Sequence, residues 1–85
     1  MYKITIRKTA NKELHNLPSK IIPKITQAIF SLADHPRPQG CKKLKGTYED
    51  LWRIRIGDYR VIYAIEDIIK IIDIQKIGHR KDIYE

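Results

Sequence analysis

Residues 51–63, LWRIRIGDYRVIY, largely alternate apolar and polar side chains on either side of a Gly57-Asp58 pair. A Gly-Asp pair between two alternating runs is a strong signal for a β-hairpin with a two-residue turn. A slip of one residue would send every side chain to the other face, so the pattern also predicts the register. The expected pairs are Ile56 with Tyr59, Arg55 with Arg60, Ile54 with Val61, Arg53 with Ile62, and Trp52 with Tyr63.

This hairpin has two unlike faces, because side chains alternate along each strand. Arg53, Arg55 and Arg60 share one face, and Arg55 lies directly opposite Arg60. Like charges in that position destabilise a hairpin by about a few tenths of a kcal/mol, which calls for a compensating acid or an anionic ligand. The other face is apolar and is expected to pack against helices; it consists of Trp52, Ile54, Ile56, Tyr59, Val61 and Tyr63.

Asp73 is the candidate for the compensating acid. If the next turn is centred on Glu66-Asp67 in the simplest register, Asp73 lies beside Arg60 on the same face. That register also places Lys70 and Lys76 on the core face, where lysine is rarely found. Two explanations of the arginine face remain open. One is an ion pair between Arg60 and Asp73 on a solvated surface, and the other is a bound anion.

The remaining segments predict an α+β domain that spans residues 1–85. Residues 2–7 alternate like a half-buried strand. Two short helices follow, one with Thr9 as its N-cap that ends at Leu17-Pro18, and one with Ser19 as its N-cap that ends at His35-Pro36. From Leu51 the chain is strand-rich to about Ile77. We expect a strand, an antiparallel helix pair, and three or four antiparallel strands forming one sheet, with the helices packed on one face.

The charge balance indicates a polyanionic partner. The chain has 85 residues and a net charge of +7, which is typical of proteins that bind nucleic acid. Residues 37–60 alone carry seven cationic and three acidic side chains. The apolar runs are far shorter than the roughly 20 residues that span a bilayer, so no membrane partner is expected. Cys41 is the single cysteine, which favours a reducing, cytoplasmic location.

Three stretches, KKLKG (42–46), LWRIRIGDYRVIY (51–63) and IGHRKDIY (77–84), resemble the RelE branch of the RelE/ParE toxin superfamily. The likeness covers nearly the whole chain, and the combination of GDYRxIY with GHRxDIY is specific. The resemblance implies a type II toxin that has a cognate antitoxin protein as partner. It implies a cytoplasmic, ribosome-dependent endoribonuclease that contacts 16S rRNA and cleaves mRNA in the A site. The RNA 2′-hydroxyl would attack its neighbouring phosphate, with no metal and no small-molecule cofactor.

The resemblance also implies roles for individual residues. Arg53 and Arg55 match basic positions on the first strand of the hairpin. Arg60 matches an arginine that stabilises charge on the reacting phosphate, and Arg80 matches one assigned as a general acid. His79 matches a position held by histidine or lysine, and Tyr84 a tyrosine that stacks on or orients the substrate. Four further residues are expected to bind RNA or the ribosome through their charge: Lys42, Lys43, Lys45 and Lys81.

One departure from the family concerns the proton acceptor. Some members have lysine where this chain has Arg53 and Arg55, and arginine effectively cannot lose its proton. The proton acceptor is therefore expected to be His79 or, second, Tyr84. Each has a structural alternative, since His79 can be an exposed residue at a strand end and Tyr84 a tail packed on the sheet. A ParE-like inhibitor of DNA gyrase and a catalytically inactive member that binds RNA or antitoxin are the alternative functions.

Overall fold

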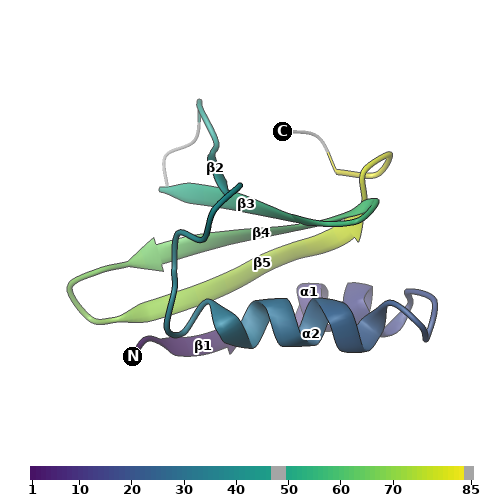
Figure 1. The fold of residues 1–85 in the computed structure, drawn as a ribbon, viewed down its shortest axis with the longest axis horizontal. Helices are drawn as coiled ribbons and strands as arrows, with labels where there is room; N and C mark the ends of the chain where they lie inside the picture. Colours follow the sequence, from purple (N-terminus) through teal and green to yellow (C-terminus); the bar gives the residue numbers. More distant parts are fainter. Residues whose placement is uncertain (47–49, 84–85) are drawn as a thin grey trace.

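The chain forms one five-stranded sheet with both helices on the same face (Figure 1). The computed structural model describes residues 1–46 and 50–83. Its elements are β1 (Lys3–Ile6), α1 (Lys8–His15), α2 (Ile22–Ser31), β2 (Lys42–Lys43), β3 (Leu51–Ile56), β4 (Tyr59–Glu66) and β5 (Ile71–His79). The strand order across the sheet is β1-β5-β4-β3-β2. The predicted α+β architecture is confirmed.

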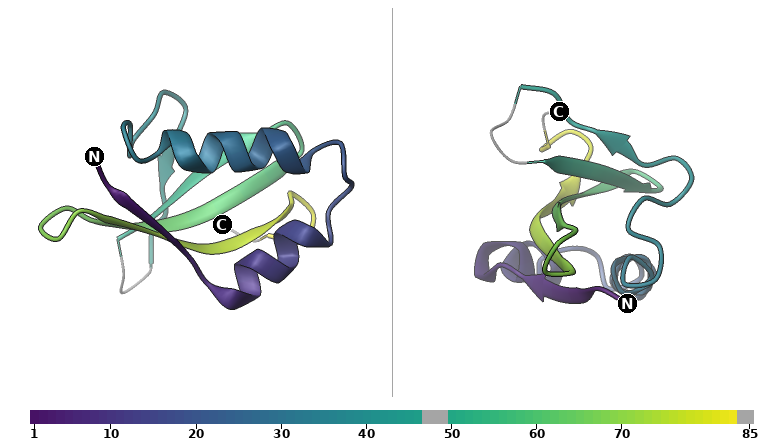
Figure 2. Two further views of the ribbon diagram at one scale, coloured as in Figure 1. Left: turned by 90° about the horizontal axis from the view of Figure 1, so that it is seen from below. Right: turned by 90° about the vertical axis from the view of Figure 1, so that its left-hand side faces the viewer.

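The sheet is mixed rather than wholly antiparallel, because β1 pairs with β5 in parallel. The other three pairings are antiparallel. After β1 the chain passes below the sheet through α1 and α2, which run in opposite directions, and enters the sheet again at the far edge (Figure 2). The last strand then comes to lie beside the first. Nothing in the alternation of residues 2–7 specifies this direction.

The hairpin of β3 and β4 has the predicted register at all five positions, from Ile56–Tyr59 to Trp52–Tyr63. Gly57 in its turn has a φ of 60°, a left-handed conformation that glycine adopts without steric cost. The apolar face of the hairpin turns toward the helices. Ile54, Val61 and Tyr63 are buried there.

The core lies between this face and the helices. α1 contacts β5 and α2 contacts β3. The buried core residues are Ala10, Leu14, Ile25, Ile29, Leu32, Ile54, Val61, Tyr63, Ile65, Ile72, Ile74 and Ile77. The Tyr63 hydroxyl donates a hydrogen bond of 2.8 Å to the carbonyl oxygen of Pro36, and its burial raises the pKa of Tyr63. Among the described residues, no helix is long and apolar enough to cross a membrane.

The helix starts differ from the sequence expectation. α1 begins at Lys8, so Thr9 lies inside it, and Arg7 holds the N-cap position without a side-chain hydrogen bond to the helix. Residues 19–21 form a turn, and α2 begins at Ile22 with Pro23 in its first turn. Thr9 and Ser19 are therefore not N-caps. Packing of an apolar stripe, rather than capping, stabilises such short helices.

The hairpin of β4 and β5 departs from the simplest register in two places. Its turn comprises four residues, Asp67–Lys70, and the pairing shifts between Ile62 and Tyr63. Tyr63 pairs with Ile74 and Ile62 with Lys76, so Gln75 is the extra residue of a β-bulge. The bulge brings Lys76 to the face of the sheet opposite the helices, where it is exposed.

This register makes the predicted Arg60–Asp73 neighbourhood wrong. Arg60 pairs with Gly78, and Asp73 pairs with Ala64, four residues further along β4. At about 3.3 Å per residue this separation is roughly 13 Å. Asp73 instead accepts hydrogen bonds from the Thr5 hydroxyl at 3.2 Å and from Nε of Arg7 at 3.1 Å. Asp73 thus links β1 and the residue that follows it to β5 through side-chain hydrogen bonds.

A cluster around Asp67 ties the loop after α2 to the β4–β5 turn. Its carboxylate accepts hydrogen bonds from Nη2 of Arg37 at 2.9 Å and from the Tyr2 hydroxyl at 2.6 Å. The Arg37 guanidinium also lies 5.0 Å from the centre of the Trp52 ring. Chiefly through the Arg37 hydrogen bond, the pKa of Asp67 falls from 3.8 to about 2, and the pKa of Arg37 is raised.

We therefore predict a loss of stability in acid that depends on Asp67. Its folded-state pKa is depressed, so its contribution is fully present above pH 3.8 and is lost as the pH falls toward 2. Urea unfolding at closely spaced pH values gives the free energy of unfolding as a function of pH. Between pH 3.8 and 2 this free energy should fall less steeply in Asp67→Asn than in the wild type. Asp34→Asn, an exposed aspartate outside the cluster, is the control and should leave the wild-type slope in place. Equal slopes for Asp67→Asn and the wild type would contradict the assignment.

Candidate active site

The face of the sheet away from the helices, called the outer face here, carries cations in two rows that cross the strands. The first row runs through residues that pair in succession from β2 to β5: Lys42, Arg53, Ile62 and Lys76. Neighbouring strands lie about 4.8 Å apart, so this row spans roughly 14 Å. That is long enough to meet more than one phosphate of an extended nucleic acid.

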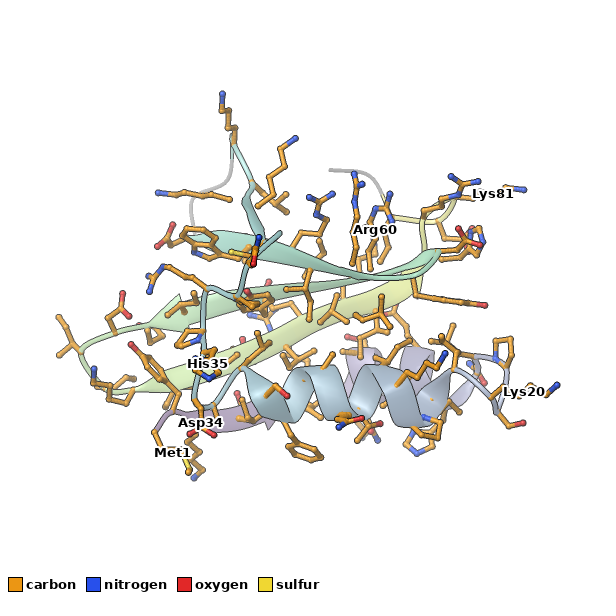
Figure 3. All side chains as sticks on the ribbon, in the orientation of Figure 1. Met1, Lys20, Asp34, His35, Arg60 and Lys81 are labelled. Carbon is orange, nitrogen blue, oxygen red and sulfur yellow. The ribbon has the colours of Figure 1, made fainter. Side chains whose placement is uncertain are left out.

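The second row consists of Arg55, Arg60 and Gly78, again paired in succession. Arg55 is exposed and Arg60 half-buried. Arg60 projects from the sheet on the side away from the helices (Figure 3). Arg53, by contrast, is only 4% exposed. The structure thus brings all three hairpin arginines to one face, with Arg55 and Arg60 at its surface and Arg53 below it.

Residues 80–83, which follow β5, fold back over this face (Figure 1). Residues 80–82 form a turn, and the Arg80 N–H donates a hydrogen bond of 2.8 Å to the carbonyl oxygen of Asp58. The Arg80 guanidinium lies 3.8 Å from the Asp58 carboxylate, which places it at the turn of the β3–β4 hairpin. Ile83 is buried against Gly78. Arg80 therefore belongs to the same end of the outer face as Arg55 and Arg60.

His79 lies on the opposite side of the sheet. It pairs with Tyr59, and its ring packs edge-on against the Tyr59 ring with 5.4 Å between centroids. Nδ1 of His79 is 3.1 Å from the backbone N–H of Lys81, so this nitrogen accepts a hydrogen bond when the ring proton is on Nε2. Gly78 and His79 are neighbours on one strand and point to opposite faces. The structure does not bring the imidazole to the arginines.

The predicted binding lysines are spread out. Lys42 belongs to the first row, whereas Lys43 forms an ion pair of 3.1 Å with Asp50. Lys45 and Lys81 are exposed in the segments after β2 and β5. Lys76 joins the site although sequence reasoning did not select it, since only the bulge turns it outward. Tyr84 lies outside the described residues.

Among the described residues, the cations of the outer face can stabilise negative charge, but the arginines cannot accept a proton. Arginine donates hydrogen bonds in a planar fork suited to phosphate, and it stays protonated. In the described ranges, no three His, Cys, Asp or Glu side chains come together to hold a metal ion. The chemistry that suits this arrangement is electrostatic stabilisation of a reacting phosphate.

Comparison with known proteins defines the class. Residues 4–84 match the family described as "ParE toxin of type II toxin-antitoxin system, parDE". The chain belongs to this family of type II toxin-antitoxin toxins.

Within the family, the similar proteins are RelE toxins. "Toxin RelE" of Mycobacterium tuberculosis is 37% identical over 84 residues, covering 98% of this chain and 86% of that protein. "Putative toxin RelE1" of Methanocaldococcus jannaschii is 33% identical, covering 99% and 96%. The archaeal RelE-RelB complex of Pyrococcus horikoshii superposes with a TM-score of 0.82 at 35% identity, covering 96% of this chain and 98% of that one. This chain is thus a RelE-type toxin.

The site geometry predicts that the hairpin gains stability when the opposed arginines are removed. Arg55→Glu replaces a repulsion across the Arg55–Arg60 pair by an attraction. The free energy of unfolding should rise by roughly 0.5 kcal/mol, measured by urea denaturation at low salt. Lys45→Glu makes the same change of charge at a position that is not paired with Arg60. This control should raise the free energy of unfolding less than Arg55→Glu does. Raising the salt concentration should shrink the difference, because salt screens exposed charges. A destabilised Arg55→Glu would contradict the proposed repulsion.

Proposed function

We propose that this protein is a ribosome-dependent endoribonuclease that cleaves mRNA in the ribosomal A site. The observation that carries the proposal is the pair of Arg55 and Arg60, which face each other on the outer face, with the Arg80 segment folded toward them. Two adjacent guanidinium groups on one face suit the oxygens of a phosphate, because each guanidinium can donate two parallel hydrogen bonds. The RelE-type relatives support the same reading.

In the proposed reaction, the 2′-oxygen forms a bond to the neighbouring phosphorus and the bond from phosphorus to the 5′-oxygen breaks. One product ends in a cyclic phosphate and the other begins with a 5′-hydroxyl. Arg55 and Arg60 hold the phosphate oxygens, on which negative charge increases in the transition state. Arg80 donates a hydrogen bond to the departing 5′-oxygen, which takes its proton from water. Lys42 and Lys76, which are exposed on the outer face, hold the flanking RNA in line.

The proton of the 2′-hydroxyl passes to water in this proposal. Arginine is a poor acceptor, and the His79 ring points to the helix side of the sheet. The cations of the outer face stabilise the alkoxide that forms, so a strong side-chain base is not essential. Lys43, Lys45 and Lys81 contribute to ribosome binding through charge, in the cytoplasm where ribosomes work.

We further propose that a cognate antitoxin protein silences the toxin. Solved relatives are complexes of RelE with RelB, among them the Pyrococcus horikoshii pair. An antitoxin segment laid on the outer face would cover Arg55 and Arg60 and keep RNA away. An antitoxin segment that displaces residues 80–83 would remove Arg80 from the site.

Removing Arg60 should abolish most of the cleavage. With purified ribosomes programmed with a defined mRNA, Arg60→Ala should lower the cleavage rate by about 10²- to 10³-fold, the usual effect of losing one transition-state donor. Lys24→Ala, an exposed cation on α2, should cleave like the wild type. Mapped mRNA ends give the product chemistry. Full cleavage by Arg60→Ala would overturn the site. Intact mRNA with the wild type, together with loss of gyrase supercoiling, would favour the ParE-like alternative.

The position of His79 gives a separate prediction. If the 2′-hydroxyl loses its proton to solvent before it attacks, the cleavage rate should rise about tenfold per pH unit from pH 6 to 9, because the fraction present as alkoxide rises with hydroxide. His79→Ala should keep this slope, since the only hydrogen bond between the imidazole and residues 80–83 that the variant removes is the one from Lys81. A wild-type rate that reaches a plateau within this pH range, and does so only when His79 is present, would identify the imidazole as the base.

A further inference from the structure

We propose that Ile83 and Gly78 are positioning residues, whose contact seats residues 80–83 on the outer face beside Arg60. The inference rests on the proposed function, since it concerns how Arg80 reaches the reacting phosphate. The residues act through the segment that they hold and do not touch the substrate themselves.

Ile83 is the observation from which the proposal starts. It is 5% exposed although it lies two residues from the end of the sequence. It does not belong to the core between sheet and helices. A Cβ placed on Gly78 would lie 3.3 Å from both Cγ1 and Cδ1 of Ile83. Because Gly78 pairs with Arg60, a Cβ there would point outward as Arg60 does. Ile83 is thus seated on Gly78, whose Cα lies about 5 Å from the Cα of its strand partner Arg60.

Glycine at position 78 is explained by space rather than by backbone conformation. The other three glycines, Gly40, Gly46 and Gly57, have positive φ angles and nothing within 4 Å of an added Cβ. Gly78 is absent from the positive-φ glycines, so other residues could adopt its backbone. What distinguishes it is the close approach of Ile83, which any larger side chain would crowd.

Hydrogen bonds fix the other end of the segment. The Arg80 N–H donates to the Asp58 carbonyl at 2.8 Å, and the Asp82 N–H donates to the His79 carbonyl at 2.8 Å. The Lys81 N–H lies 3.1 Å from Nδ1 of His79. These bonds turn the chain back over the sheet, and Ile83 then anchors it on Gly78. Arg80 lies between the two anchors, so its backbone is held from both sides. His79 therefore has a structural role: from the helix side of the sheet, its Nδ1 accepts the Lys81 hydrogen bond that stabilises the turn.

The anchor matters for rate because a displacement of a reacting group by about 1 Å can cost up to a hundredfold. Loss of the Ile83 contact would free the far end of the segment and weaken the hydrogen-bonded turn that holds Arg80. RNA binding relies mainly on the two rows of cations and would change little. The expected signature is a lower kcat with a nearly unchanged KM.

The test compares variants on both sides of the contact in the ribosome-bound mRNA assay. Ile83→Ser should lower kcat by about 10- to 100-fold with KM changed less than threefold, whereas Ile83→Val should stay within about threefold of the wild type. Gly78→Ala should lower kcat by crowding Ile83. Adding Ile83→Val, which lacks Cδ1, should restore part of that loss. Ile69→Ser is the matched control, since Ile69 is 63% exposed in the β4–β5 turn, and it should leave kcat unchanged.

Amide hydrogen exchange supplies a readout that does not depend on activity. In Ile83→Ser the amides of residues 80–82 should exchange faster, while those of β4 should keep their protection. Unchanged exchange, or a kcat loss that follows a general loss of protection in β4, would overturn the proposal. If the wild type leaves mRNA intact, the proposed function fails, and the exchange data still decide whether Ile83 seats the segment.

Discussion

The pairing of β3 with β4 around Gly57-Asp58 is the constraint on which the rest of the structure depends. It sorts thirteen residues, 51–63, into a face that the helices cover and a face that carries arginine. A slip of one residue would place arginines in the core and isoleucines in water. Core packing and the cationic site are therefore two consequences of one register. The second hairpin and both helices attach to the frame that this register builds.

The same register creates the main conflict in the molecule. Arg55 and Arg60 face each other, and like charges that are directly opposite on neighbouring strands repel each other. Local rules are broken most often where function requires it. The helix side of the sheet, with its continuous set of buried isoleucines, supplies the stability that lets the outer face stay cationic. The helix-covered face of the sheet thus supplies the hydrophobic core, and the outer face carries the cationic site.

Small irregularities then decide which side chains join the site. One extra residue, Gln75, turns Lys76 outward, and the four-residue turn carries Asp73 away from Arg60 to Thr5 and Arg7. The alternation of a regular strand places Gly78 under Ile83 and His79 on the other side. Because a strand has a period of two, a shift of one residue is enough to move a charge from one face to the other.

Much of the fold followed from the sequence by itself. The alternation of residues 51–63 determined the hairpin, its five pairs and its two faces, because neighbouring residues alone set that pattern. The short loop after Leu17 determined that the helices fold back on each other. Alternation also placed Arg53, Arg55 and Arg60 on one face of the hairpin. The family resemblance added His79, Arg80 and Tyr84 to the predicted site. Other features depended on contacts between segments far apart in the chain. These are the parallel direction of β1, the bulge at Gln75, the burial of Arg53, the side on which His79 lies, and the seat of Ile83 on Gly78. Only the tertiary structure decided them, because local periodicity carries no information about which distant strand or side chain will fill a given space.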